Sequence, residues 1–168
     1  STFSKYPVAG APAQTNVRNS NYPQILADKK VIFKTKAPLA TKVQVDLGRK
    51  YDMTKDSEGF WNVTTDTISQ GFHYYSLLID GVAVADPASQ TFYGMGRMAS
   101  GIEIPSSTGG YYALRDVPHG DIRIKKYFSK TTNSWRQMYV YTPPGYDLNT
   151  TETYPILYIL HGGGEDES

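Results

Sequence analysis

The stretch FHYYSLLIDGVAVA, residues 72–85, decides the fold of the N-terminal part of this chain. Its first eight residues combine aromatic and aliphatic side chains, a composition that favours a β-strand. Asp80-Gly81 follows, and an Asp-Gly pair between two apolar runs is a strong signal for a tight hairpin turn. The return strand is predicted at residues 82–85. The stretch therefore predicts an antiparallel hairpin and, with it, a β domain.

Short strands separated by turn residues surround this hairpin. Val43, Val45 and Leu47 alternate with polar residues, as in a half-buried strand. Further strands are predicted around residue 32 and at residues 60–65. Because no amphipathic helix separates these strands, the pattern favours a β-sandwich.

Two side chains of these strands are assigned to the core. Trp61 shares a strand face with Val63, which favours a core position over a sugar platform. His73 is in register with Tyr75 and Leu77, so we interpret it as a core histidine with a hydrogen-bond partner. Tyr74 then faces outward and is a candidate for stacking on a sugar ring.

Four segments are expected along the chain. Residues 1–22 are rich in Pro, Ala, Gln and Asn and predict an extended N-terminal arm, and residues 23–100 form the sandwich. The Gly, Ser and Pro content of residues 93–118 indicates a structured connector, with its domain boundaries drawn at 101–118. Residues 119–168 begin a second domain, in which Ile122 and Ile124 alternate with basic residues as in a strand and a second strand is predicted at residues 135–141.

The second domain contains the motif that indicates chemistry. Ile156-Leu157-Tyr158-Ile159-Leu160 is apolar on both faces, as in a central strand buried between helix layers. His161-Gly162-Gly163-Gly164 follows at once. Glycine amides can approach a ligand closely and stabilise the negative oxygen of acyl transfer. The strand-then-loop context predicts an oxyanion-hole loop at Gly162, Gly163 and Gly164, over the alternative of a flexible turn.

The flanking motifs resemble known families. Val117-Pro118-His119-Gly120, YTPPGYD (141–147) and HGGGEDE (161–167) are similar to carbohydrate esterase family 1, and most similar to feruloyl and acetyl-xylan esterases of the esterase D type. GFWNVT (59–64) and the hairpin through Asp86-Pro87 resemble carbohydrate-binding module family 48. The resemblance runs from Tyr22 onward. It implies a mainly β fold, an Ig-like β-sandwich followed by the first strands of an α/β-hydrolase domain.

This resemblance implies a serine carboxylic-ester hydrolase that removes feruloyl, or acetyl, groups from plant xylan. Such enzymes use a serine in a Gly-x-Ser-x-Gly elbow, assisted by a histidine and an acid. The chain has no such pentapeptide, and none of its three histidines is in a plausible triad position. We therefore expect the chain to be truncated before the catalytic serine and to be inactive alone. The alternative is a non-catalytic module that binds xylan or an α-glucan, or only braces an esterase.

Binding residues, cofactors and partners follow from the same reasoning. Tyr93 and Arg97 lie in the predicted connector. Their favoured role is packing between the two domains, and the alternative role is contact with a sugar. Neither His119 nor His161 has a metal-ligand neighbour at useful spacing, and neither a metal nor another cofactor is expected. The apolar faces of residues 120–168 are expected to be covered by a retained C-terminal fragment or by a strand-exchanged second copy.

Composition limits the partners. The chain has 17 basic and 16 acidic side chains, and no basic run favours nucleic acid or an anionic membrane. No apolar run approaches the roughly 18 residues of a membrane span. A neutral plant cell-wall polysaccharide, such as feruloylated arabinoxylan, is the expected partner. The resemblance implies a bacterial protein that is secreted, periplasmic or on the cell surface.

Overall fold

The computed structural model describes residues 10–106, 115–148 and 151–166, and these residues form strands and no helix. The predicted mainly β fold is therefore confirmed. With no helix in these ranges, no described segment is a helical membrane span. The chain divides into two units, residues 1–110 and 111–168, which we describe separately.

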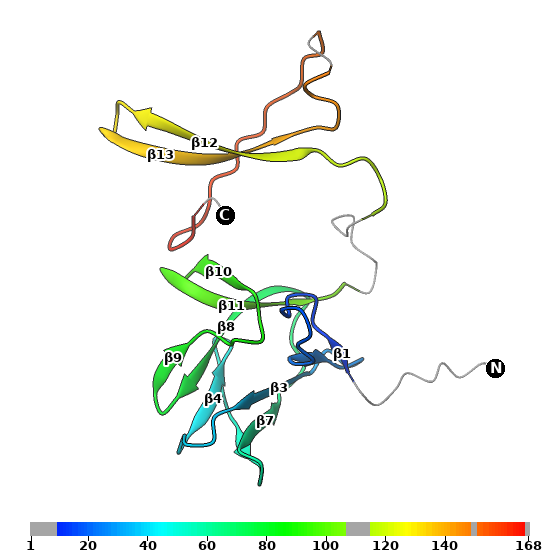
Figure 1. Cartoon of the computed structure of the whole chain (residues 1–168), viewed down its shortest axis with the longest axis vertical. Helices are drawn as coiled ribbons and strands as arrows, with labels where there is room; N and C mark the ends of the chain where they lie inside the picture. Colours follow the sequence, from blue (N-terminus) through cyan, green and yellow to red (C-terminus); the bar gives the residue numbers. More distant parts are fainter. Residues whose placement is uncertain (1–9, 107–114, 149–150, 167–168) are drawn as a thin grey trace, which may run out of the picture. The chain divides into compact units, whose positions relative to one another are not determined.

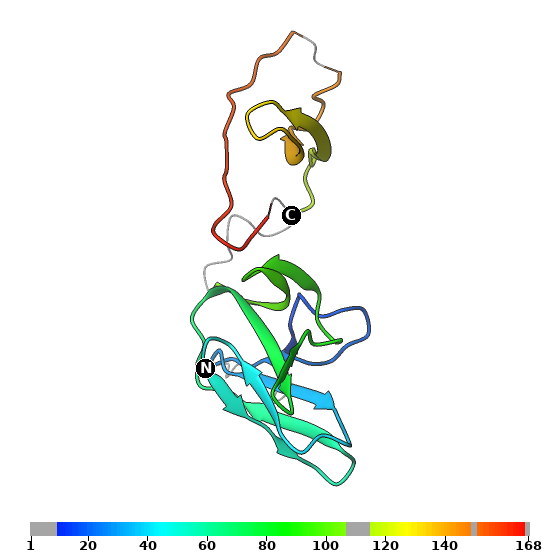
Figure 2. The same cartoon turned by 90° about the vertical axis from the view of Figure 1, so that its left-hand side faces the viewer.

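The first unit has two antiparallel sheets, most of whose strands are labelled in Figure 1 and which Figure 2 shows turned by 90°. The first sheet has the order β1 (Ala11–Pro12), β2 (Gln24–Ile25), β3 (Val31–Lys36), β7 (Phe60–Thr64), β6 (Thr54–Lys55). The second has the order β10 (Thr91–Gly94), β11 (Arg97–Ile104), β8 (Gly71–Ile79), β4 (Val43–Asp46), β5 (Lys50–Asp52), with β9 (Val82–Val84) paired to β8.

The predicted hairpin is confirmed as β8 and β9. Asp80 has φ of 48° and Gly81 has φ of 88°, the left-handed pair that a type I′ turn needs. The Asp80 carboxylate oxygen Oδ1 also accepts hydrogen bonds from the Thr41 backbone N–H at 2.9 Å and the Lys42 N–H at 2.8 Å. The turn is thereby fixed to the start of β4, the neighbouring strand.

The core lies between the two sheets and follows strand alternation. It contains the side chains of Val31, Phe33, Trp61, Val43, Val45, Tyr75, Leu77, Ile102 and Ile104. The rings of Phe33 and Tyr75 meet edge to face across the sheets, with centroids 4.9 Å apart. Trp61 is 7% exposed, which confirms its core position, and its Nε1–H donates to Ala37 O at 2.8 Å.

The structure corrects the predicted boundary between the sandwich and the connector. The composition of residues 93–118 suggested a connector, with its bounds placed at 101–118, but β10 and β11 form a hairpin of the second sheet that runs to Ile104, and Ile102 and Ile104 are fully buried. The glycines of this stretch suggested a loop. In the structure Gly94 lies under the Tyr74 ring, where a Cβ would approach Cζ to 2.3 Å, so the glycine makes room for an aromatic side chain.

The described part of the N-terminal arm belongs to the sandwich. Strand β1 pairs with β2, and Asn16 forms a bridge with Ser89. Ala13 and Thr15 are buried. The polar composition hid these contacts because the strand is only two residues long.

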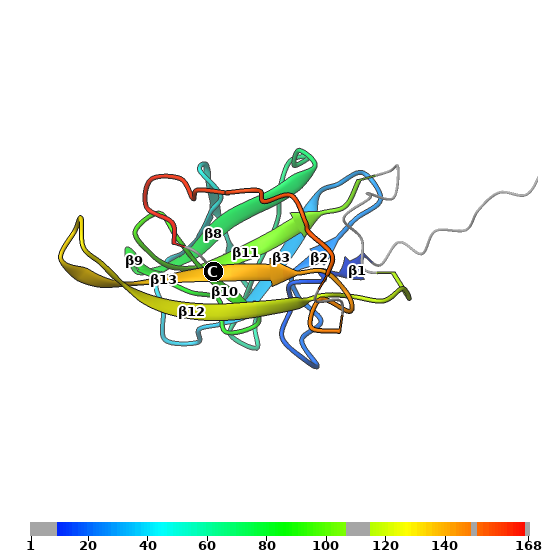
Figure 3. The ribbon, with the colours of Figure 1, turned by 90° about the horizontal axis from the view of Figure 1, so that it is seen from above.

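The second unit contains one long hairpin, β12 (Asp121–Ser129) and β13 (Ser134–Thr142), paired over its whole length (Figures 1 and 3). Both strands were predicted. Gly120 precedes β12 and lies against the end of β13, since a Cβ there would be 1.9 Å from Thr142 O. A side chain at this position would push the two strands apart.

The end of the YTPPGYD motif (141–147) contacts this hairpin. A turn brings the Tyr146 N–H to Pro143 O at 3.2 Å. Asp147 then forms an ion pair with Arg123 of β12, whose guanidinium lies 5.4 Å from the Tyr146 ring centroid. Arg123 lowers the pKa of Asp147 through its hydrogen bond and its charge. The motif therefore anchors the loop after β13.

The predicted strand at Ile156 to Leu160 is wrong for this structure. These five side chains are 75–91% exposed, and no described strand pairs with them. A central strand needs partners for its backbone on both sides and layers over both faces. The described residues of the second unit provide one hairpin, but no strand paired with residues 156–160 and no layer over either face of them.

Candidate functional site

The predicted oxyanion loop, residues 162–164, is an exposed turn held by hydrogen bonds to Glu165. The Gly162 N–H donates to Glu165 Oε2 at 2.9 Å, and the Glu165 N–H donates back to Gly162 O at 3.4 Å. His161 Nδ1 lies 2.9 Å from Gly162 O, so the protonated nitrogen donates to that carbonyl. Gly164 has φ of 81°, the left-handed conformation that glycine tolerates.

This geometry defines what the loop can bind. A carboxylate oxygen is an anionic acceptor, as is the oxyanion of an acyl-transfer intermediate. The Gly162 amide therefore already holds an acceptor of the right charge. Within the described residues the amides of Gly163 and Gly164 have no hydrogen-bond acceptor. A groove lined by Trp135, Met138 and Leu160 separates this segment from the hairpin.

No described histidine has the surroundings of a catalytic base. His73 Nε2 lies 2.8 Å from the carbonyl O of Ser69 and 3.4 Å from its Oγ. Because a carbonyl only accepts, that nitrogen carries the proton and cannot take one from the hydroxyl. His119 Nε2 bonds in the same way to Arg115 O at 2.8 Å. The described residues also contain no cluster of three potential metal ligands.

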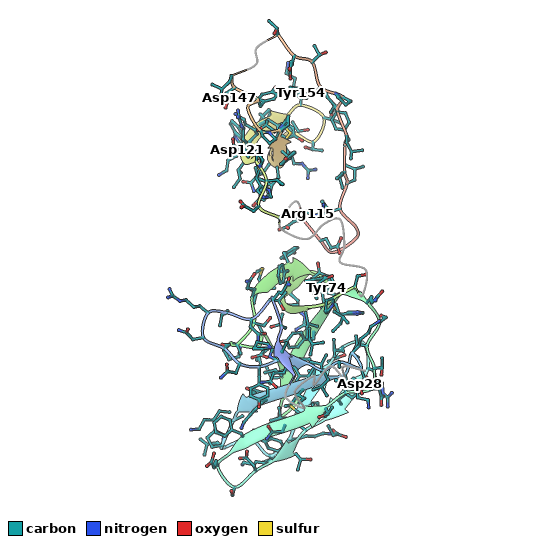
Figure 4. The ribbon with its side chains drawn as sticks, turned by 90° about the vertical axis from the view of Figure 1, so that its right-hand side faces the viewer. Asp28, Tyr74, Arg115, Asp121, Asp147 and Tyr154 are labelled. Atoms are coloured by element: carbon teal, nitrogen blue, oxygen red, sulfur yellow. The ribbon has the colours of Figure 1, made fainter. Side chains whose placement is uncertain are left out.

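The three predicted sugar-contact residues lie on one sheet but not on one face. Tyr74 of β8 and Arg97 of β11 share the outer face, where Arg97 Nη2 donates to Ser76 Oγ at 3.0 Å. Tyr93 alternates to the opposite, core-facing side. The Tyr74 ring, labelled in Figure 4, lies on Gly94 and meets Phe72 edge to face with centroids 5.0 Å apart. The structure thus brings two of the three together.

A buried carboxylate in the sandwich escaped the sequence interpretation. Asp86 is 3% exposed and accepts a hydrogen bond from the Tyr75 hydroxyl at 2.8 Å and from the Ala88 N–H at 2.9 Å. Burial raises the pKa of Asp86, and these two hydrogen bonds oppose the rise. The pKa of Tyr75 is also raised, first by burial and then by the Asp86 charge.

A groove on the first sheet was also missed. It has a volume of about 370 Å³ and is lined by Tyr22, Phe60, Lys34 and Lys36, among others. The register of β3 and β7 places Lys36 opposite Phe60. Alternation from buried Phe33 could have placed both lysines on the outer face. The pairing with Phe60, 24 residues beyond Lys36, was not readable from the sequence.

No protein-family model matches this chain. An endo-1,4-beta-xylanase/feruloyl esterase from Xylanibacter ruminicola is 37% identical over 166 residues, which are 94% of this chain and 23% of that protein. This chain is similar to a xylanase/feruloyl esterase. It spans less than a quarter of the length of that curated relative, so the relative's catalytic activities extend to this chain only as proposals.

Solved structures show weaker likenesses. Enterochelin esterase from Shigella flexneri has a TM-score of 0.48 at 16% identity, over 69% of this chain and 41% of that one. A structure titled putative alpha amylase from Salmonella typhimurium has a TM-score of 0.45 at 24% identity, over 60% of this chain and 17% of that one. Both TM-scores are below 0.5, so neither likeness bears on function.

Proposed function

We propose that this chain is the N-terminal part of a serine carboxylic-ester hydrolase that removes feruloyl, or acetyl, groups from plant xylan outside the bacterial cytoplasm. The observation that carries the proposal is the 37% identity to a xylanase/feruloyl esterase along nearly the whole chain. The Gly162 amide supports it, because that amide already donates to an anionic oxygen.

The catalytic groups would be divided between these 168 residues and sequence that follows them. The 168 residues contribute the glycine loop, whereas the nucleophile, base and acid would come from sequence beyond Ser168. The same further chain would pair with Ile156 to Leu160 and cover the hairpin, turning the exposed coil into an interior strand. Glu165 would then leave the Gly162 amide, which the substrate carbonyl would take. The 168 residues alone would not hydrolyse esters.

The test is ferulate release from feruloylated arabinoxylan by the chain expressed with any coding sequence that follows Ser168. Gly162→Pro removes the amide donor and should lower kcat by about 10²–10³ with little change in KM. Glu165→Ala is the matched variant, because it frees the same amide and should keep kcat. Equal activity in Gly162→Pro, or no ester hydrolysis by the extended chain, would rule the proposal out.

A second candidate is carbohydrate binding by the sandwich, favoured by the shared outer face of Tyr74 and Arg97. Affinity gels with arabinoxylan and with starch test it, using Arg97→Ala against Arg49→Ala, a change of an exposed arginine in the turn between β4 and β5. Retardation that only Arg97→Ala reduces supports binding at this face. No retardation on either polymer leaves the sandwich a structural role.

A further inference from the structure

The groove on the first sheet combines an aromatic ring with two converging cations. Lys34 Nζ lies 4.5 Å from the centroid of the Phe60 ring, and Lys36 Nζ lies 5.2 Å from it. Lys34 Nζ is also 5.8 Å from the Tyr22 ring centroid. Cation–π attraction keeps both ammonium groups beside these rings, so positive charge is concentrated in the groove.

This charge is not neutralised by an ion pair. Across the part of the chain that the structure describes, every ion pair involves other cations, namely Lys30, Lys42, Arg49 and Arg123. Asp56 does not line the groove, and its pKa is lowered first by the hydrogen bond from the Phe60 N–H at 2.9 Å and last by the Lys34 charge. Asp86 does line the groove, but it is 3% exposed and its carboxylate accepts hydrogen bonds from the Tyr75 hydroxyl and the Ala88 N–H. The groove therefore has a net positive character on a chain whose formal charge is only +1.

The shape and the walls of the groove narrow the class of ligand. Its volume of about 370 Å³ lies at the lower end of small-molecule sites, roughly 300–1,000 Å³. Ser20 and Asn21 add polar side chains to the aromatic walls. Aromatic faces bind the C–H face of a sugar ring, polar side chains bind its hydroxyl groups, and ammonium groups bind a carboxylate.

We propose that the groove of Tyr22, Lys34, Lys36 and Phe60 binds a saccharide that carries a carboxylate, such as a uronic acid side group of a polysaccharide. The two ammonium groups contact the carboxylate, and Phe60 packs on the sugar ring beside it. This inference departs from the neutral ligand that the overall charge suggested. It does not depend on ester hydrolysis, because it uses only the sandwich of this chain.

Isothermal titration of the full chain with three oligosaccharides tests the proposal. The probes are xylotetraose with one 4-O-methylglucuronic acid, the same compound with its carboxyl reduced to an alcohol, and plain xylotetraose. We expect the acidic probe to bind at least tenfold more tightly than either neutral one, and the preference to shrink as salt rises. Equal affinities, or no binding by the folded chain, would overturn the proposal.

Variants locate the site. Lys34→Gln with Lys36→Gln should abolish the tenfold preference, and Phe60→Ala should weaken all three probes. Lys50→Gln with Lys125→Gln removes the same charge from exposed positions elsewhere and should change nothing. A preference that survives the first pair, or is lost equally in the control pair, would show that the groove is not the site. Circular dichroism confirms that each variant is folded.

Discussion

Strands β8 and β13 each have nine residues and a comparable share of aromatic and aliphatic side chains, but they differ in burial. In β8, Tyr75 and Leu77 are 1% exposed, whereas in β13 Trp135 is 72% exposed and Tyr141 is 63% exposed. Strand β8 lies in a sheet with another sheet over its inner face. Strand β13 has one partner strand and no second described layer.

The comparison separates two properties that a sequence pattern combines. Period-2 alternation predicts that a strand forms, and both β8 and β13 are strands in the structure. Burial needs a second layer, which the first unit has and the described second unit lacks. Stability should therefore reside in the sandwich, because an isolated two-stranded hairpin is marginal in water.

The largest expected effect comes from the same substitution in the two units. Phe33→Ala removes the ring that contacts Tyr75 and leaves a cavity in the core, so it should lower the free energy of unfolding by about 3–5 kcal/mol. Phe128→Ala changes a half-exposed ring of β12 and should cost less than about 1 kcal/mol. Urea unfolding followed by Trp61 fluorescence, in a Trp135→Phe background, measures the effect of each change on the stability of the sandwich. Similar costs would show that the two units share one core.

The next effect concerns pH and the buried Asp86. Its raised pKa means that the folded sandwich holds this proton to higher pH than the unfolded chain, where the pKa is about 3.9. The stability from protonation is complete below that value and is lost as pH rises through the folded-state pKa.

Asp86→Asn removes this proton and also one hydrogen-bond acceptor, at a cost of about 1–3 kcal/mol. The free energy of unfolding, measured from pH 4 upward, should fall more steeply in the parent chain than in this variant. Parallel curves would show that Asp86 ionises in the folded sandwich as it does in the unfolded chain.

The smallest effect is at the hairpin turn of the sandwich. Hydrogen bonds from the Thr41 hydroxyl and from the Lys42 and Thr41 amides lower the pKa of Asp80. Its stabilisation is therefore present above the unfolded pKa near 3.9 and lost as pH falls through the lower folded value. Asp80→Asn keeps a residue that tolerates the left-handed turn, and it should lower the urea midpoint at pH 7 by an amount that shrinks as the pH falls below about 3.9. A drop in midpoint that stays constant over this pH range would assign the effect to turn geometry.

Local signals explain what could be predicted from the sequence. Asp80-Gly81 and the alternation around Val43 depend on neighbouring residues, so the sandwich and both strands of the second unit were predictable. The β10–β11 hairpin was missed because Gly94 and Gly96 suggest a loop until Tyr74 is seen to pack on Gly94. The prediction for Ile156 to Leu160 was wrong in the opposite sense, because a strand was predicted where the structure has none. An apolar run predicts an interior strand whether or not its neighbouring strands are present.

The candidate site shows the same limit. The glycine loop was visible as a motif, but its closure by Glu165 depends on a turn. The cationic groove depends on the register of β3 and β7, which joins Lys36 to a residue 24 positions later. A local turn decides the first site and a contact between strands decides the second, and composition indicates neither.

Native-state hydrogen exchange on the full chain, kept monomeric as checked by light scattering, tests the central claim most directly. Amides of β3, β8 and β11 should exchange only through global unfolding, whereas those of β12 and β13 should exchange many times faster through local opening. Equal protection of both groups in a monomer would contradict the account, because the hairpin would then share the stability of the sandwich.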